Sequence, residues 1–295
     1  MTVNRTSHAV SVGNLQAMVP PSGQPAIAVE SRQLVKQYGV IRAVDGVSFR
    51  VSRGEIFGFL GANGAGKTTT LRMLCGLLTP TSGTALIDGI DIISEPLLAK
   101  ARLGYLDEEP FVHPHLSGRE FLHYIADLYR MPRGREREER MERLLSLFEL
   151  ANRDGELIGG YSHGMRQKIG LASLLIREPP VLLLDEPTNG LDPRSARLVK
   201  DLLEELAARG TTVLLSTHIL EVAQALCRRV AIIDRGRIVA TGTMEELRAQ
   251  TGAEQASLED LFLQLTAGPE SKEMIERLLA PTPPLVPLPP PGGRL

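Results

Sequence analysis

The sequence has no tryptophan, two cysteines and few aromatic residues, and its charges almost cancel. Cys75 and Cys227 lie in apolar helical patterns, which favours buried thiols in a reducing compartment and excludes a disulfide framework. The 33 basic and 35 acidic residues give a net charge of −2, which provides no reason to expect a nucleic-acid partner. No apolar run approaches the roughly 18 to 20 residues that cross a bilayer. We therefore expect a globular chain that does not span a membrane by itself.

The two ends of the chain differ in composition from its centre. Residues 1–26 lack a basic segment followed by an apolar one, and they lack a cleavage-site pattern, so we expect a flexible lead-in and no signal peptide. Residues 269–295 end in "PTPPLVPLPPPGGRL", which predicts a disordered or polyproline-like tail and leaves open its use as a ligand for a partner. The 43% hydrophobic content is enough for a sizeable core.

Strand and helix patterns fill the centre of the chain. Residues 27–52 alternate apolar and polar side chains around two turn signals, "YG" and "DG", and residues 83–92 repeat the pattern, so both segments predict antiparallel strands. After a helical pattern at about 117–152, apolar strand patterns alternate with helical ones. This alternation predicts a mainly parallel α/β sheet covered on both faces.

A glycine-rich stretch, "GFLGANGAGKTTTLRML", lies between a short apolar strand pattern and a helical pattern. Glycines let the backbone approach an anion where a side chain would forbid it. Strand, glycine loop and helix in this order are the context of the phosphate-binding pattern G-x-x-x-x-G-K-[ST]. The stretch therefore predicts a nucleoside triphosphate site, with a glycine-rich turn as the structural alternative. The predicted nucleotide-binding residues are Gly61, Asn63, Gly64, Ala65, Gly66, Lys67, Thr68 and Thr69.

The residue types in this loop and in a second motif, "VLLLDEP", predict phosphate chemistry. Lys67 would hold the β- and γ-phosphates as a catalytic residue, and the Thr68 hydroxyl can ligate Mg²⁺. The second motif places two acids after a buried strand, at the edge where open α/β sheets bind ligands. There Asp185 can hold Mg²⁺ through water, and Glu186 can orient or deprotonate the attacking water. A surface pair of acids that ends a strand is the alternative.

With these motifs in place, the sequence resembles the ATP-binding cassette family over residues 27–268. The phosphate loop is "GANGAGKTT", the signature loop is "YSHGM", the Walker B strand is "VLLLDEP", the D-loop is "NGLD", and "STHIL" contains the switch histidine. Their order and spacing carry the resemblance. It implies an α/β fold, a P-loop NTPase core with a mainly parallel sheet, an antiparallel β subdomain and a helical signature subdomain at about 107–178.

The resemblance implies roles for residues whose types alone say little. His218 would contact the γ-phosphate as a catalytic residue, and Tyr38 would stack on adenine. Taken alone, the histidine is more typical of a structural residue, and the tyrosine of a core or hairpin aromatic. Ser162 and Gly164 of the signature loop would complete the nucleotide site of a second cassette.

The resemblance also implies a mechanism and partners. Two cassettes, expected to be two copies of this chain, would sandwich two ATP molecules head to tail and separate on hydrolysis. The motion would pass through residues 108–116 to an integral membrane permease. The chain would then be an ATPase that powers transport, expected to be export, and would lie in the cytoplasm against the inner face of the cell membrane.

Two departures from the family pattern favour one branch of it. The signature loop has Tyr and His where Leu and Gly are usual, and Met165 stands in the glutamine position. The loop that usually supplies a glutamine to Mg²⁺ has Glu108, which can still ligate the ion as an oxygen donor. These variants and the "SLEDLFLQLTAG" segment look like the single-cassette ATPases that export drugs, lipids, polysaccharides or components of metal-related maturation systems.

Two other interpretations of a cassette are possible: a soluble ATPase of translation or DNA repair, and a regulatory module without turnover. A soluble ATPase of translation usually carries two cassettes, whereas one phosphate loop is present here, and a DNA-repair type needs a long coiled coil, for which no sustained heptad repeat is found. A nucleotide-binding regulatory module without turnover is disfavoured because Glu186 and His218 are both present.

The role of Tyr38 can be tested by its ring. Stacking of an aromatic ring on a base contributes about 1 to 3 kcal/mol, so Tyr38→Ala should weaken ATP binding whereas Tyr38→Phe should not. A nucleotide titration measures both affinities. Equal affinities for the two variants would make Tyr38 a packing residue.

Overall fold

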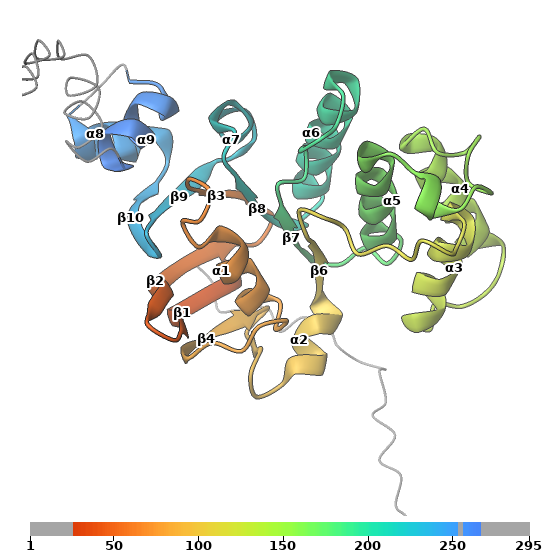
Figure 1. Ribbon diagram of the computed structural model, residues 1–295, viewed down its shortest axis with the longest axis horizontal. Coiled ribbons are helices and arrows are strands. Elements are labelled where there is room, and N and C mark those ends of the chain that lie inside the picture. The colour runs from red at the N-terminus through yellow and green to blue at the C-terminus, as the bar shows by residue number, and fades with distance from the viewer. Residues whose placement is uncertain (1–25, 253–255, 267–295) are drawn as a thin grey trace, which may run out of the picture.

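The computed structural model describes residues 26–252 and 256–266, so that most of the predicted lead-in and all of the predicted tail lie outside the described residues. Its centre is a six-stranded sheet in the order β10-β9-β3-β8-β7-β6 (Figure 1). Five of these strands pair in parallel, and β10 pairs antiparallel to β9. The strands are β3 (Ile56–Leu60), β6 (Leu103–Leu106), β7 (Val181–Asp185), β8 (Thr212–Thr217), β9 (Arg229–Asp234) and β10 (Arg237–Gly242).

A second sheet of four antiparallel strands has the order β2-β1-β4-β5. Its strands are β1 (Ile27–Tyr38), β2 (Ile41–Ser52), β4 (Ser82–Ile87) and β5 (Ile90–Asp91). The turn predicted at "DG" is wrong, because Asp45 and Gly46 lie inside β2. Leu34 pairs with Val47 and Lys36 with Val44, so β2 has one more residue than β1 between these two pairs. Gly46 lies in this interval and adopts a left-handed φ of 71°. An extra residue that glycine accommodates makes a bulge in place of a turn.

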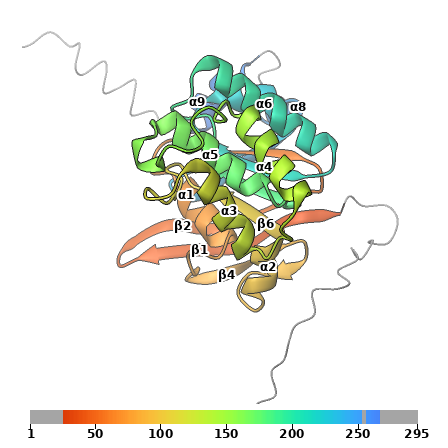
Figure 2. The same cartoon turned by 90° about the vertical axis from the view of Figure 1, so that its right-hand side faces the viewer.

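Helices flank both ends and both faces of the central sheet. Figure 1 places α1 beside the antiparallel sheet, α3 to α5 beyond the β6 edge and α8 and α9 at the opposite end, and in Figure 2 α3 to α5 lie toward the viewer. The helices are α1 (Lys67–Leu74), α2 (Pro96–Arg102), α3 (Gly118–Leu128), α4 (Arg135–Leu147), α5 (His163–Leu175), α6 (Pro193–Ala208), α7 (Leu220–Leu226), α8 (Met244–Thr251) and α9 (Leu258–Thr266), with a 3₁₀ turn at Ile158–Gly160. Within the described ranges, no helix combines the length and apolar character needed to cross a bilayer.

Successive side chains of β7 point alternately into two hydrophobic cores, one on each face of the central sheet. Val181 and Leu183 pack in the core that contains α1 and the antiparallel sheet, whereas Leu182 and Leu184 pack in the core that contains α3 to α7. Side chains that alternate between two buried faces explain why this strand is apolar throughout. The predicted fold class, with its parallel core, antiparallel subdomain and helical group, is confirmed.

The glycine loop after β3 is held against β9. A Cβ atom at Gly61 would lie 2.6 Å from the carbonyl oxygen of Ile233 and 2.8 Å from its Cγ2 atom. Gly61→Ala should therefore lower the free energy of unfolding by about 1 to 3 kcal/mol through overpacking. Thermal or urea unfolding measures the change.

Gly155→Ala is the matched control, because a Cβ atom there meets no described residue within 4 Å. It should stabilise the protein slightly, by about 0.4 to 1 kcal/mol, because alanine restricts the unfolded chain. Equal stability of the two variants would contradict the close approach of the loop to β9.

Candidate active site

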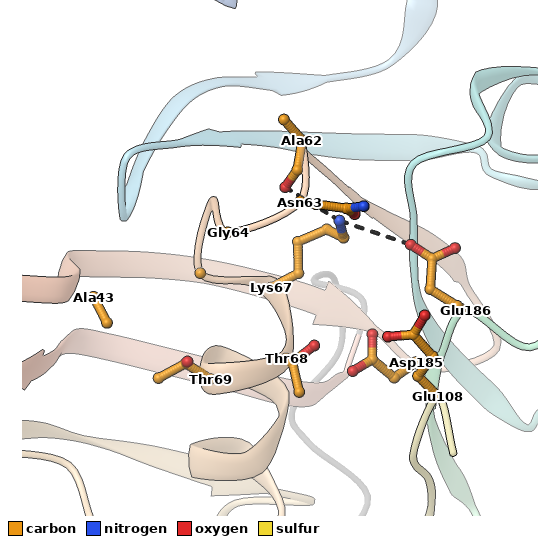
Figure 3. Close-up of a pocket in the computed structure, with 11 residues that line it drawn as sticks. Ala43, Ala62, Asn63, Gly64, Lys67, Thr68, Thr69, Glu108, Asp185 and Glu186 are labelled. Atoms are coloured by element: carbon orange, nitrogen blue, oxygen red, sulfur yellow. Dashed lines mark hydrogen bonds and ion pairs between the residues drawn. The ribbon is translucent and has the colours of Figure 1, made fainter. Parts of the chain in front are cut away.

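The glycine loop and the ends of two strands enclose a cavity of about 240 Å³ (Figure 3). Six of the predicted nucleotide-binding residues and all the predicted metal-binding residues line it. Its lining consists of Ala43, Ala62, Asn63, Gly64, Gly66, Lys67, Thr68, Thr69, Glu108, Asp185 and Glu186.

The backbone of the loop explains its glycines. Gly64 and Gly66 have left-handed φ angles of 82° and 109°, and a Cβ atom at Gly66 would lie 2.7 Å from the carbonyl oxygen of Ala43. Helix α1 begins directly afterwards at Lys67 without a side-chain cap, which leaves its first amides available to an anion. Ala65 supports the loop, since its buried carbonyl accepts a hydrogen bond of 2.9 Å from the amide of Gly236.

The ammonium group of Lys67 lies inside the cavity wall. Its Nζ donates to the carbonyl oxygens of Gly61 at 2.8 Å and Ala62 at 3.4 Å, and it lies 3.7 Å from Oε1 of Glu186 (Figure 3). The lysine side chain is 7% exposed, and the glutamate side chain 5%. The buried ammonium group of Lys67 and the free amides of α1 contribute positive charge that can bind phosphate groups.

Asp185 ends β7 and is fully buried. The Ser216 hydroxyl donates to its Oδ1 atom, whereas its Oδ2 atom has no hydrogen-bond partner among the described residues. Burial raises the pKa of Asp185 because the charged form is poorly solvated. A buried carboxylate with one oxygen unpaired has the chemistry of a cation ligand, since a cation would offset that desolvation.

Glu186 carries a network of contacts at the next position. Its Oε1 atom lies 2.8 Å from Nδ1 of His218, and its Oε2 atom accepts a hydrogen bond of 3.0 Å from the Thr217 hydroxyl. Its backbone has a left-handed φ of 47°, an unusual conformation for a residue with a side chain. The side-chain amide of Gln167 donates a hydrogen bond of 3.3 Å to the backbone carbonyl of Pro187, the residue after Glu186. The carboxylate is thus buried, oriented and next to both Lys67 and His218.

Glu108 reaches the cavity from the segment that follows β6. Its Oε1 atom accepts a hydrogen bond of 3.2 Å from the side-chain amide of Asn189, which belongs to the "NGLD" segment. In Figure 3 its carboxylate lies beside that of Asp185, on the side of the cavity opposite the loop.

Six of the predicted residues do not line the cavity: Gly61, Ala65 and His218 contact residues that line it, and Tyr38, Ser162 and Gly164 lie elsewhere. Tyr38 ends β1, is 50% exposed and does not line the cavity, although Ala43 on the paired strand does. Ser162 and Gly164 also do not line it. Ser162 caps α5 by accepting a hydrogen bond from the amide of Met165, and Gly164 packs on the carbonyl oxygen of Gly190. The structure therefore does not bring the signature loop to the phosphate loop of its own chain.

The sequence did not identify several residues that support the site. Ser216 and Thr217 precede the histidine in "STHIL", Gln167 follows the signature loop, and Asn189 opens the D-loop. Each forms a hydrogen bond with a residue at least 20 positions away along the chain. A hydroxyl pair at the end of an apolar strand was the one available signal, and it is common in strands without such a role.

Together these features define a phosphate-binding loop, a buried acid pair and a histidine at one edge of a parallel sheet. A family described as "ABC transporter" matches residues 44–189. The chain is 42% identical to the "Daunorubicin resistance ATP-binding protein DrrA3" of Streptomyces coeruleorubidus over 230 residues, 78% of this chain and 72% of that protein. The chain belongs to the ABC transporter family, as a transporter ATP-binding subunit that hydrolyses ATP.

Two further proteins are similar to it. The "Nod factor export ATP-binding protein I" of Rhizobium meliloti is 39% identical over 222 residues, 75% of this chain and 66% of that protein. A solved structure, described as the dimeric post-hydrolysis state of an ATP-binding cassette bound to ADP and inorganic phosphate, has a TM-score of 0.69 and 25% identity, covering 73% of this chain and 98% of that one. The names of these relatives agree with the transport class and give no support to a translation or DNA-repair ATPase.

Proposed function

We propose that this chain is one of two cassettes in an exporter, and that the cassettes close head to tail around two ATP molecules. The observation that carries the proposal is the division of the predicted site. Lys67 and Glu186 line one cavity and His218 lies 2.8 Å from Glu186, while Ser162 and Gly164 of the same chain do not line it. A second copy, placed head to tail, would supply these two signature-loop residues, and the dimeric state of the similar cassette structure supports this arrangement.

The positions of three side chains support a different role for each of them in hydrolysis. Lys67 and the first amides of α1 bind the phosphates and stabilise the charge that develops on them. Glu186 accepts a proton from the attacking water, because its carboxylate is buried and directed by neighbouring groups. His218, which lies 2.8 Å from this carboxylate, would contact the γ-phosphate.

Three oxygen donors fit Mg²⁺ in this cavity: the hydroxyl of Thr68, the unpaired Oδ2 of Asp185 and the carboxylate of Glu108. Among the described residues no group of three or more His, Cys, Asp or Glu could hold a metal by itself. Mg²⁺ is commonly held by one or two carboxylates together with phosphate oxygens and water, so this sparse donor set suits it. Bound there, the ion would neutralise charge on the β- and γ-phosphates.

The membrane partner would be an integral permease, which would place the chain in the cytoplasm against the inner face of the cell membrane. The Phe111 side chain is 93% exposed in the segment at 108–116 that follows the cavity-lining Glu108. An exposed aromatic side chain next to the nucleotide site suits contact with a partner that responds to hydrolysis. The names of the relatives, one for drug resistance and one for Nod factor export, support export as the direction.

The metal role of Glu108 predicts a change in Mg²⁺ dependence. Glu108→Ala should raise the Mg²⁺ concentration for half-maximal ATPase activity, because one oxygen donor is lost. Glu109→Ala removes the same charge from the neighbouring exposed residue, which does not line the cavity, and should leave this concentration unchanged. If the two variants respond alike to Mg²⁺, the charge at Glu108 is incidental.

The base and the shared site are tested together by Glu186→Gln. The glutamine keeps the shape but loses the base, so the ATPase rate should fall about 10²- to 10⁴-fold. ATP should remain bound between Lys67 of one copy and Ser162 of the other, because a ligand held across an interface stabilises the dimer by mass action. Size measurements should find a dimer with ATP and Mg²⁺ and a monomer with ADP.

The two parts of this prediction fail separately. Wild-type turnover in Glu186→Gln would remove this residue from catalysis. Slow turnover without an ATP-dependent dimer, checked at high protein concentration, would keep the base and reject the shared site.

A further inference from the structure

Strand β8 ends with two hydroxyl side chains that lie beside the two acids at the end of β7. Asp185 and Ser216 are paired in the parallel ladder, and the amide of Glu186 donates to the carbonyl oxygen of Ser216 at 3.1 Å. The side chains repeat this pairing, since the Ser216 hydroxyl donates to Asp185 and the Thr217 hydroxyl to Glu186. Each acid thus has one oxygen held by the neighbouring strand.

The hydroxyl of Thr217 has one proton, and its surroundings decide where that proton points. The amide of Ile219 donates to the same Oγ1 atom at 3.0 Å, so it occupies the acceptor side of the hydroxyl. The Oε2 atom of Glu186, also at 3.0 Å, is then the partner for the proton. Thr217 is 1% exposed, which leaves little access for competing water.

This contact determines which oxygen of Glu186 is available. The terminal torsion of a glutamate is broad and roughly two-fold, so the torsion alone does not fix the carboxylate plane. With Oε2 held by Thr217, Oε1 is the oxygen that faces His218 at 2.8 Å and Lys67 at 3.7 Å. In Figure 3 the carboxylate of Glu186 is directed toward Lys67 across the cavity.

We propose that Thr217 is a positioning residue for ATP hydrolysis, whose hydroxyl holds one carboxylate oxygen of Glu186 so that the other faces the attacking water. The proposal rests on the proposed role of Glu186 as the base. Thr217 does not line the cavity, so its loss should change the rate of the chemical step and not the binding of nucleotide. A hydroxyl that orients a reacting carboxylate acts through geometry, because a small rotation of the carboxylate would move its oxygen away from the attacking water.

The test uses Thr217→Val, which keeps the shape and removes the hydroxyl, and Thr217→Ser, which keeps the hydroxyl. Thr217→Val should lower kcat about 10- to 100-fold, by analogy with the loss of groups that orient the ligands of a metal. Its ATP affinity should equal that of the wild type, and Thr217→Ser should restore most of kcat. Thr217→Ala, which also lacks the hydroxyl, replaces the valine variant if that variant does not fold.

Thr212→Val is the matched control at the other end of β8. Thr212 is equally buried, and its hydroxyl oxygen accepts a hydrogen bond from the amide of Gly54 at 3.0 Å, as that of Thr217 does from Ile219. Thr212→Val should therefore lower Tm to a similar extent and leave kcat unchanged.

Three results would overturn the proposal. One is a wild-type kcat in Thr217→Val, and another is an equal loss of kcat in Thr217→Val and Thr212→Val, which would make the effect one of stability. The third comes from Glu186→Gln combined with Thr217→Val: a further loss of kcat beyond that of Glu186→Gln alone would mean that the threonine acts elsewhere. If Glu186→Gln itself turns over normally, the proposed base fails first.

Discussion

The parallel pairing of β3, β8 and β7 is the constraint on which the site depends. Leu60, the last residue before the glycine loop, is paired with Thr217, and Asp185 is paired with Ser216. Parallel strands end at the same edge of a sheet, so this ladder brings the loop, the acids and the histidine segment together. The backbone pairing alone does this, whatever contacts their side chains make. A slip of one residue in this register would turn Asp185 toward the opposite face of the sheet.

At that edge the site holds more negative charge than the protein compensates. Lys67 lies near Glu186, but one oxygen of Asp185 has no hydrogen-bond partner in the described part of the chain, and burial raises the pKa of that group. A cation bound together with phosphates would reduce this imbalance, which connects ligand binding to the stability of the site. The burial that raises the pKa of Asp185 also strengthens the hydrogen bonds that orient the carboxylate of Glu186, because little water competes for them.

Most of the fold and most of the cavity could be predicted because they depend on local patterns. Apolar runs predicted β3 and β7, and the glycine spacing predicted the loop whose left-handed residues the structure contains. The "DG" pair shows the limit, because the same dipeptide serves a turn or a bulge and the pairing of β2 with β1 decides between them. The hydroxyl of Thr217 and the amide of Asn189 were missed for a similar reason, since their partners are 31 and 81 residues away along the chain.

The sequence by itself determined the chemistry available to this protein: one loop that binds phosphate, two acids after an apolar strand, and a histidine at the end of another. It also determined the order of strands and helices, because the periodicity of apolar residues follows from which faces are buried. Only the tertiary structure decided which oxygen of each acid is held by a hydroxyl and which is left for a ligand. It also decided that the signature loop lies outside the cavity of its own chain. These outcomes depend on contacts between distant segments, whose geometry no local pattern contains.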